Sequence, residues 1–428
     1  MNAHPRRRLS AFLLMASAGT AYAVPPAATD ALLTHTLTNG EARPLAALAA
    51  LRIHNGAVSY RYVGGFARKN GADVTPVHSD TLFRIASVSK FVTTIGLMQL
   101  VDQGRIDLDA DASKYLGFPL RNPDFPDTPI TTRMLLSHTA SIADADDYVI
   151  PADHTVPEFF EASRRPGTAD YHFLPGRKPG TWFSYCNLCY GLVGTMIERV
   201  SGERFDLYQQ KHVLTPLGID GGYDPALLSH PEHLATLYHH TATGYEAAKD
   251  SDTHFAPEAS AQYQIGTNAT IFSPQGGLRI SLDGLYRLSQ FVFGNGTLQG
   301  VKVLSSQSLQ TMLHSGWHYD GHNGEGPYPI ASYGLATIQL TGARDPSGHP
   351  TTPWRGYQGG LVGHLGDAYG LRSGFWFNPA TRDGYLFIAD GFPEDGKEKP
   401  GKVSSFTNVE EEIFSALSNA GSVSGTVQ

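Results

Sequence analysis

Residues 83–104 read FRIASVSKFVTTIGLMQLVDQG. Apolar residues recur at helical spacing from about Ser87 to Gln103, and Gly104 is a typical helix C-terminal cap. The segment therefore predicts a helix whose first turn carries Ser87 and Lys90 on one face, because residues three apart are neighbours on a helix. If burial or a nearby cation lowers the pKa of Lys90, the neutral amine can accept the serine proton. The helix N-terminus also offers backbone N–H groups to an oxyanion.

Two further motifs contain residue types suited to the same chemistry. Tyr185 and Asn187 form a Y-x-N just before a helix predicted over about 188–200. A tyrosine whose pKa is lowered by a lysine can serve as general base, and an asparagine can bind a substrate carbonyl. His364 and Gly366 lie in a strand-like segment, where glycine lets another backbone or a substrate approach closely. Each motif is weak by itself, because such short patterns arise by chance.

Strand patterns lie at both ends of the chain and helical patterns lie between them. Residues 46–53 and 57–66 flank Asn55-Gly56, a pair that favours a tight hairpin turn. Strand-like segments recur over 361–365, 370–378 and 385–390, and a closing helix is expected over 405–418. We therefore predict an α+β fold, with an antiparallel sheet formed from both chain ends, flanking helices and an inserted, mostly helical region.

The predicted domain covers residues 45–420. Its sheet region comprises about 45–110 and 270–420, and its helical region about 111–269. Hydrophobic residues make up 41% of the chain and charged residues 17%, which is a globular composition. The net charge of −8 and the absence of a basic stripe argue against a nucleic-acid partner.

The N-terminus has the pattern of a secretory signal peptide over residues 1–23. Arg6, Arg7 and Arg8 precede an apolar stretch, and Ala21-Tyr22-Ala23 reads as a cleavage site. We expect a periplasmic or secreted protein with a loose lead-in over 24–44. No other apolar run reaches the length of a membrane span, so we expect no stable span.

Together these motifs resemble the penicillin-recognising serine hydrolases, in the branch that contains class C β-lactamases, D,D-peptidases, D-aminopeptidases and β-lactamase-like carboxylesterases. The similarity runs from about residue 46 to 415, in the order of the family. The resembling segments are Phe83–Lys90, Leu100–Asp109, Leu135–Thr139, Ser273–Leu278 and Gly363–Gly366. The Y-x-N motif and the separations between the motifs suit the class C-like branch better than the class A branch, which has S-D-N.

The resemblance implies the β-lactamase/penicillin-binding-protein-like fold and a serine mechanism. Ser87 is then the acylated nucleophile, and Lys90 and Tyr185 share the general-base and general-acid work. The open subclasses are an esterase or amidase of neutral substrates, a D,D-carboxypeptidase or D-aminopeptidase, and a β-lactamase. A non-catalytic penicillin-binding sensor is a different class of protein, which the intact Ser87, Lys90 and Tyr185 disfavour.

The resemblance also implies roles for residues around the nucleophile. Asn187 holds the acyl side chain of the substrate, and His364 replaces a lysine of typical β-lactamases and polarises Tyr185. The backbone N–H groups of Ser87 and Asp367 form the oxyanion hole, with Gly366 beside them. We expect a small-molecule or peptide substrate, no cofactor and no metal, while the oligomeric state stays open.

Leu365 departs from the family pattern. β-Lactamases and D,D-peptidases usually carry a hydroxyl residue there that contacts the substrate carboxylate. Leucine cannot make this hydrogen bond, so the sequence predicts a preference for uncharged substrates. An arginine from another loop, Arg355 or Arg372, is the alternative source of that contact.

Several other residues could form metal, redox or substrate-binding sites, but we give most of them structural interpretations. Cys186 and Cys189 can form a disulfide after export, and whether they are oxidised stays open. We interpret them as two small residues on a packed helix instead of a redox motif or a zinc site. For His138 we expect a hydrogen-bonded structural role. We do not take the pair His239-His240 as a metal site. We interpret the acidic group as a solvated loop; its members are Asp144, Asp146 and Asp147. Three aromatic residues suit a substrate cleft or a core equally: Trp354, Tyr357 and Trp376.

Overall fold

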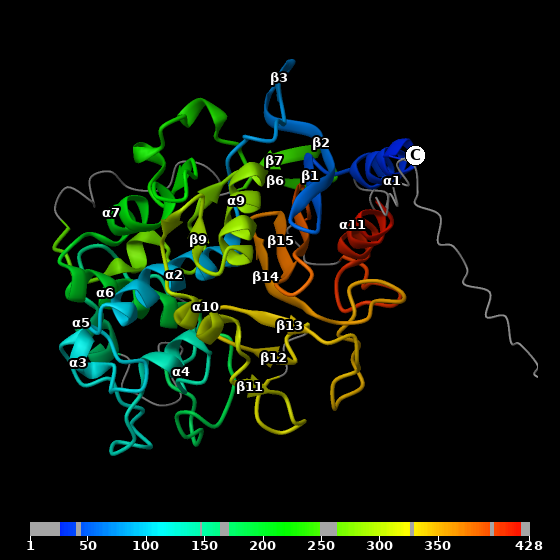
Figure 1. Ribbon diagram of the computed structural model, residues 1–428. Helices are drawn as coiled ribbons and strands as arrows, with labels where there is room; N and C mark the ends of the chain where they lie inside the picture. The colour runs from blue at the N-terminus through cyan, green and yellow to red at the C-terminus, as the bar shows by residue number, and fades with distance from the viewer. Residues whose placement is uncertain are drawn as a thin grey trace, which may run out of the picture.

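A nine-stranded antiparallel sheet lies between two helical layers (Figure 1). The computed structural model describes residues 26–39, 44–145, 148–162, 171–248, 263–325, 329–393 and 398–420. The strand order is β11-β12-β13-β14-β15-β16-β1-β2-β3. The bounds are β1 Ala47–His54, β2 Ala57–Asn70, β3 Asp73–Pro76, β11 Trp317–His318, β12 Ser332–Tyr333, β13 Ile338–Leu340, β14 Leu361–Ala368, β15 Leu371–Asn378 and β16 Asp383–Asp390.

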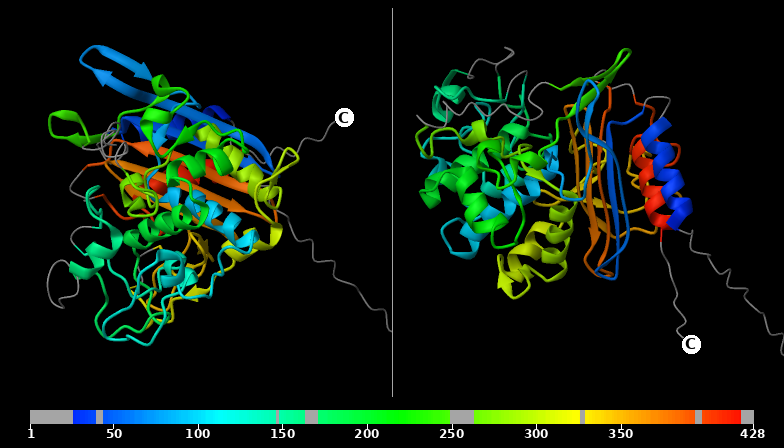
Figure 2. Two further views of the ribbon diagram at one scale, coloured as in Figure 1. Left: turned by 90° about the vertical axis from the view of Figure 1, so that its left-hand side faces the viewer. Right: turned by 90° about the horizontal axis from the view of Figure 1, so that it is seen from above.

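Two helices cover one face of the sheet and the other long helices cover the opposite face, as the view from above shows (Figure 2). The first pair is α1 (Pro26–Asn39) and α11 (Asn408–Asn419). On the other side lie α2 (Ser89–Asp102), α3 (Ser113–Leu116), α4 (Thr132–Leu136), α5 (Val156–Ala162), α6 (Asn187–Ser201), α7 (Phe205–Gln209), α9 (Leu282–Phe293) and α10 (Ser306–Leu313). Within the described residues, no helix is both long and apolar enough to cross a membrane.

Short elements complete the fold. The 3-10 turns are η2 (Ala86–Val88), η4 (Pro225–Leu227), η5 (Pro231–His233) and η6 (Ala269–Phe272), and η3 (Gln210–Leu214) is a π-helical turn. The short strands are β4 (Phe83–Arg84), β5 (Gly221–Gly222), β6 (Tyr238–Thr241), β7 (Gly244–Ala247), β8 (Arg279–Ile280), β9 (Thr297–Leu298) and β10 (Val301–Lys302). The predicted helical region, 111–269, thus also contains β5 and the β6–β7 hairpin.

The two ends of the chain meet in the sheet, which confirms the predicted fold class. β1 pairs antiparallel with β16 from Ala47 opposite Asp390 to Ile53 opposite Gly384. The turn between β1 and β2 contains Asn55 and Gly56, both with positive φ, as a tight hairpin of this type requires.

Both faces of the central strands are buried, so the middles of these strands are runs of apolar residues instead of alternating with polar ones. On the α2 side, Phe91 packs against Phe375 with ring centroids 5.2 Å apart. On the opposite side, Phe387 packs against Phe414 of α11 at 5.4 Å. The sheet therefore separates two hydrophobic cores.

The predicted loose lead-in over 24–44 is wrong for residues 26–39, which form α1. Leu33 is fully buried, and the Thr36 hydroxyl donates a hydrogen bond of 3.1 Å to Glu412 of α11. The folded domain therefore begins before residue 45, where we predicted its start. Composition alone suggested a loop, because the buried face of this helix includes Thr29 and Thr36 beside Leu33 and Leu37 and so shows no apolar stripe. The predicted signal peptide, 1–23, lies outside the described residues.

Candidate active site

Ser87 lies in the η2 turn immediately before α2, at the start of the predicted helix. Ala86 has a φ of 50°, in the left-handed region that residues with a side chain seldom adopt, so the chain turns sharply here. The neighbouring segment fixes this turn, because the Ile85 N–H donates to Leu278 O at 3.0 Å and the Leu278 N–H donates to Ser89 Oγ at 3.0 Å. Ser87 itself remains partly exposed, as a nucleophile requires.

Lys90 is fully buried and makes three polar contacts through its amine. Nζ lies 3.0 Å from Ser87 Oγ, 2.8 Å from Asn187 Oδ1 and 3.0 Å from Gln275 O. The two oxygens of Asn187 and Gln275 can only accept hydrogen bonds. A neutral amine therefore uses its two N–H groups on them and keeps its lone pair for the Ser87 hydroxyl.

Burial lowers the pKa of Lys90 to about 7, and the nearby Asp144 carboxylate only partly opposes this shift. A substantial fraction of the lysine is therefore neutral at physiological pH. The condition for Lys90 to accept the serine proton, a pKa lowered by burial, is therefore met.

The expectation that lysine lowers the pKa of Tyr185 is wrong. Burial of the phenol raises the pKa of Tyr185 above its usual range, although the hydrogen bond with Ser87 acts in the opposite direction. Lys90 Nζ lies 4.8 Å from the centroid of the Tyr185 ring, over its face. Tyr185 is therefore a neutral hydroxyl at physiological pH, suited to donate or relay a proton.

Asn187 is held from both ends of its amide. Its Oδ1 accepts from Lys90, and its Nδ2 donates to Asp144 at 2.8 Å. Asp144 also accepts the Leu188 N–H at 2.9 Å, in the first turn of α6. The interpretation of Asp144 as a solvated loop residue is therefore wrong, because it orients Asn187 and binds the end of a helix. Asp146 and Asp147 lie outside the described residues.

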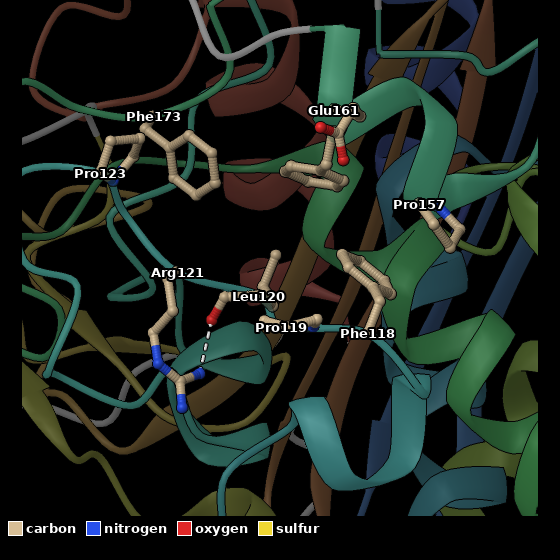
Figure 3. Close-up of a pocket in the computed structure, with 9 residues that line it drawn as sticks. Phe118, Pro119, Leu120, Arg121, Pro123, Pro157, Glu161 and Phe173 are labelled. Atoms are coloured by element: carbon tan, nitrogen blue, oxygen red, sulfur yellow. Dashed lines mark hydrogen bonds between the residues drawn. The ribbon is translucent and has the colours of Figure 1, made fainter.

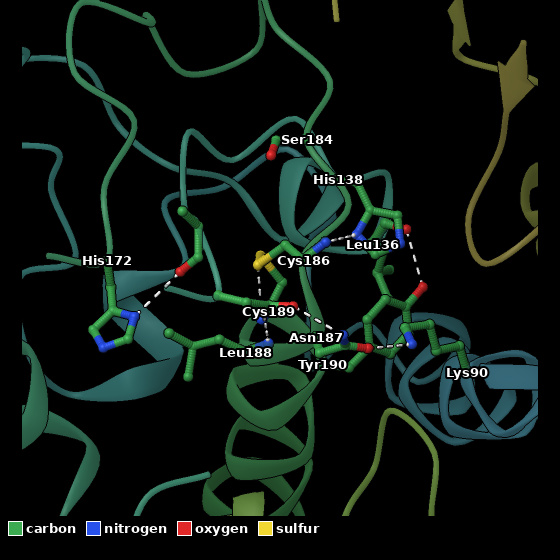
Figure 4. Close-up of a disulfide and its surroundings, with 12 residues drawn as sticks. Lys90, Leu136, His138, His172, Ser184, Cys186, Asn187, Leu188, Cys189 and Tyr190 are labelled. Atoms are coloured by element: carbon green, nitrogen blue, oxygen red, sulfur yellow. Dashed lines mark hydrogen bonds between the residues drawn. A yellow bond between two sulfur atoms is a disulfide. The ribbon is translucent and has the colours of Figure 1, made fainter. Parts of the chain in front are cut away.

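Cys186 and Cys189 form a disulfide at the start of α6, a question that the sequence left open (Figure 4). Both side chains are fully buried. Cys186 lies between Tyr185 and Asn187, and its sulfur accepts the Cys189 N–H as the N-cap of the helix. The disulfide thus lies within the segment that carries two of the candidate site residues.

His364 has a hydrogen bond with Tyr333 and a ring contact with Tyr185. Its Nε2 lies 2.9 Å from the hydroxyl of Tyr333, whereas its ring centroid is 6.3 Å from that of Tyr185. Burial, assisted by the charge of Lys90, lowers the pKa of His364 to about 3. An uncharged imidazole supplies no positive charge to polarise Tyr185.

Gly366 brings β14 against the nucleophile segment. A Cβ atom at this position would lie 2.4 Å from Ile85 O and 3.2 Å from the Ala86 side chain, so only glycine fits. The next residue, Asp367, directs its carboxylate to Arg372 at 3.2 Å. The roles of the Ser87 and Asp367 N–H groups as an oxyanion hole stay predictions.

Tyr333 is a site residue that the sequence reasoning missed. It is fully buried on the two-residue strand β12 and contacts both His364 and His138. Such a short strand gives no periodic signal, and its distance from every motif along the chain hid the contact. His138 is hydrogen-bonded and buried, in agreement with its predicted structural role.

The other candidates lie apart from this chemistry. Trp376 is a fully buried core residue, and Trp354 packs on Tyr385 and Phe414 on the α11 face. His239 approaches Phe392 O at 3.3 Å. Within the described residues, no group of three or more His, Cys, Asp or Glu is arranged to hold a metal. A separate cavity of about 350 Å³, lined by Phe118, Arg121, Phe160 and Phe173 among others, contains none of the candidate site residues (Figure 3).

Comparison with known proteins identifies the family. The model of the beta-lactamase family matches residues 33–404, which is most of the chain. This chain belongs to the beta-lactamase family. The match begins within α1, in agreement with the packing of that helix in the domain.

Characterised relatives of this beta-lactamase-family protein have different activities. The chain is 30% identical over 210 residues to the esterase EstB of Burkholderia gladioli, covering 46% of this chain and 51% of that protein. It is 30% identical over 161 residues to the D-alanyl-D-alanine-carboxypeptidase/endopeptidase AmpH of Escherichia coli K12, covering 36% of this chain and 40% of that protein. The matches thus span about half or less of each relative.

Solved structures share the fold over nearly the whole chain. A D-amino acid amidase from Ochrobactrum anthropi has a TM-score of 0.64 at 20% identity, covering 92% of this chain and 99% of that chain. A class C beta lactamase from Rhodobacter sphaeroides has a TM-score of 0.62 at 16% identity, covering 91% and 98%. At these identities the likeness establishes the fold alone.

Proposed function

We propose that this protein is an exported serine hydrolase that cleaves an ester or amide bond through an acyl-enzyme on Ser87. The supporting observation is the geometry of the Lys90 amine, whose two N–H groups are committed to Asn187 and Gln275 while its lone pair faces the serine. A lysine whose pKa lies at about 7 combines sufficient basicity with a large neutral fraction.

The proposed acylation moves one proton through this group. Lys90 removes the proton from Ser87 Oγ while Oγ bonds to the substrate carbonyl carbon, and the carbonyl oxygen becomes an oxyanion. When the tetrahedral intermediate collapses, the bond to the leaving group breaks. The neutral Tyr185 hydroxyl donates its proton to the leaving group and recovers one from Lys90. Water then repeats the sequence on the acyl-enzyme and releases the acid and free Ser87.

Short acyl esters or uncharged amides are the substrate class that the local charges favour. Leu365 offers no hydroxyl to a substrate carboxylate, and His364 is uncharged. Arg372 is already paired with Asp367 and Glu398 at 3.2 Å each and approaches Glu410 at 3.8 Å. Three carboxylates therefore surround this one guanidinium, which argues against the alternative that it binds a substrate carboxylate.

A D-peptidase is the second candidate, favoured by the edge of β14. Among the residues that the structure describes, strand β13 pairs with β14 only over Leu361 to Gly363, so the following residues of β14 offer an edge to which an extended peptide can bind. The test below includes a peptide substrate for this reason.

Export is part of the proposal. The charged and apolar pattern of residues 1–23 is that of a signal peptide, and the Cys186–Cys189 disulfide suits an oxidising compartment. N-terminal sequencing of protein from the extracytoplasmic fraction should begin at Val24. An uncleaved protein recovered from the cytoplasm would contradict this part.

Covalent labelling tests the central step. A fluorophosphonate probe should add one label to Ser87, and Ser87→Ala should abolish both the label and the hydrolysis of p-nitrophenyl butyrate, a D-Ala-D-Ala peptide or nitrocefin. The matched control is Ser59→Ala, which removes an exposed serine hydroxyl from β2 and should leave labelling unchanged. Labelling that persists in Ser87→Ala would overturn the proposal.

A further inference from the structure

A chain of buried hydrogen bonds crosses from the segment that carries Tyr185 and Asn187 to strand β14. The Cys186 N–H donates to His138 Nδ1 at 3.1 Å, and His138 Nε2 lies 3.1 Å from the Tyr333 hydroxyl. The same hydroxyl lies 2.9 Å from His364 Nε2, and His364 Nδ1 reaches Leu365 O. The beginning of this chain at Cys186 and His138 is visible in Figure 4.

The chemistry of the end groups determines every proton in this chain. A backbone N–H only donates, so His138 accepts at Nδ1 and, being neutral, carries its proton on Nε2. A carbonyl oxygen only accepts, so His364 carries its proton on Nδ1 and accepts at Nε2. The Tyr333 hydroxyl therefore accepts from His138 and donates to His364. Its other polar neighbour, the Tyr190 hydroxyl, donates its own proton to Leu136 O. All four bonds are satisfied by one arrangement, in which neither imidazole is charged.

The three side chains are at most 1% exposed, so water cannot replace a lost partner without rearrangement. The chain also borders the proposed catalytic groups. The His138 ring centroid lies 4.4 Å from that of Tyr185, and Cys186 lies between Tyr185 and Asn187. A change at Tyr333 is thus transmitted to Tyr185 through His138 and to β14 through His364.

We propose that Tyr333 is a positioning residue that holds the Tyr185–Asn187 segment and β14 at a fixed separation by joining His138 to His364. The inference rests on the proposed function, because its consequence is the placement of Tyr185 relative to Ser87. Tyr333 does not itself touch the reacting atoms. It accepts from one imidazole and donates to the other, and so fixes the geometry of the two sides of the site.

Nitrogen-15 NMR of the histidines in the wild-type protein tests the chain without any catalytic measurement. We expect His138 to be protonated on Nε2 and His364 on Nδ1, with both rings neutral at pH 7. His138→Gln and His364→Gln samples assign the two signals. The opposite tautomer at either ring would overturn the proposal, even if Ser87 labels as expected.

Tyr333→Phe tests the consequence. We expect the nitrogen-15 signature of His364 Nε2 to change as it loses its hydrogen-bond donor, and kcat to fall by about 10-fold to 100-fold with KM within about threefold, as for a displaced catalytic group. The control is Tyr208→Phe, which removes another buried phenol, hydrogen-bonded to Gln99 Oε1 at 3.3 Å near the far end of α2. This control should leave both the signature and kcat unchanged.

Failure of the inference and failure of the proposed function are distinguishable. A folded Tyr333→Phe protein with wild-type kcat would overturn the positioning role while Ser87 still labels. If Tyr333→Phe does not fold, the wild-type tautomers decide the question. Absence of Ser87 labelling in the wild-type protein, with the expected tautomers present, would refute the proposed function instead.

Discussion

At the scale of single residues, environment determines what each group can do. Lys90 is a residue type that normally stays charged on the surface, and its complete burial lowers its pKa to about 7. The same burial raises the pKa of Tyr185, so Tyr185 stays neutral while a substantial fraction of Lys90 becomes neutral. This arrangement supplies a base and an acid at one pH.

The first prediction concerns the pH dependence of acylation. Protonated Lys90 cannot accept the Ser87 proton, so kcat/KM should fall about tenfold per pH unit below its pKa of about 7 and level off above it. Lys90→Ala should lower the rate by about 10²–10⁴ and remove this acid limb. His364, whose pKa lies at about 3, cannot produce the limb. The measurement is a kcat/KM profile from pH 5 to 9, and an acid limb that persists in Lys90→Ala would contradict the assignment.

The second prediction concerns Gly366. Gly366→Ala places a methyl group 2.4 Å from Ile85 O, so β14 and the nucleophile segment must separate. We expect a loss of about 100-fold or more in kcat/KM, because small displacements of a nucleophile are costly. Gly316→Ala is the control, since its Cβ would meet no atom within 4 Å. Equal activity of the two variants would refute the close approach.

At the scale of elements, the start of α6 combines several functions. Its N-cap is Cys186, its first residue is Asn187 and its first turn contains the disulfide. Neither cysteine matches a catalytic position of the family. The disulfide therefore belongs to the stability of this turn rather than to the chemistry.

The third prediction is that the double variant Cys186→Ser, Cys189→Ser keeps turnover within a few-fold. Serine is itself a good N-cap, so the helix start should persist. The loop closed by the disulfide is short, and its loss should cost about 2 kcal/mol, lowering the melting temperature by a few degrees. Calorimetry and initial rates measure the two effects. A thousandfold loss of rate in a folded double variant would show that the disulfide is essential to the site.

Helix α1 provides the fourth prediction. Leu33→Ala should destabilise the protein by about 2–5 kcal/mol, because it opens a cavity in the core beneath α1 and α11. Leu32→Ala is the control on the adjacent position, where the side chain is 49% exposed, and should have little effect. Denaturant unfolding compares the two, and similar midpoints would mean that α1 does not pack as described.

At the scale of the whole molecule, the site lies where distant parts of the chain meet. The nucleophile follows β4, Tyr185 precedes α6 and His364 belongs to β14, so three segments contribute. The charges around β14 also come from separate elements, since Arg372 lies on β15 and Glu410 on α11. Substrate preference is therefore a property of the assembled sheet and its helices.

The fifth prediction follows from these charges. Wild-type protein should hydrolyse p-nitrophenyl butyrate with a higher kcat/KM than a D-Ala-D-Ala peptide or nitrocefin. Leu365→Thr should shift the ratio toward the carboxylate substrates by about tenfold or more, the worth of one hydrogen bond to a charged group. Leu365→Val is the control without a hydroxyl. A wild-type preference for the peptide or nitrocefin that Leu365→Thr leaves unchanged would contradict the predicted role of Leu365.

The sequence by itself determined the local relations in this protein. Ser87 and Lys90 share a helix face because they are three residues apart, and Asn55-Gly56 closes a hairpin because of its backbone preferences. Gly366 was expected at a close approach because it interrupts a strand pattern. These inferences need no knowledge of distant residues, which is why they agree with the structure.

Only the tertiary structure determined which distant residues contact each other and which buried groups are charged. Tyr333 meets His364, Asp144 meets Asn187 and α1 meets α11 across long separations in sequence, which no periodicity encodes. The pKa of Tyr185 was predicted in the wrong direction for the same reason. Desolvation arises from everything that excludes water around a group, and that environment exists only once the sheet and both helical layers have packed together.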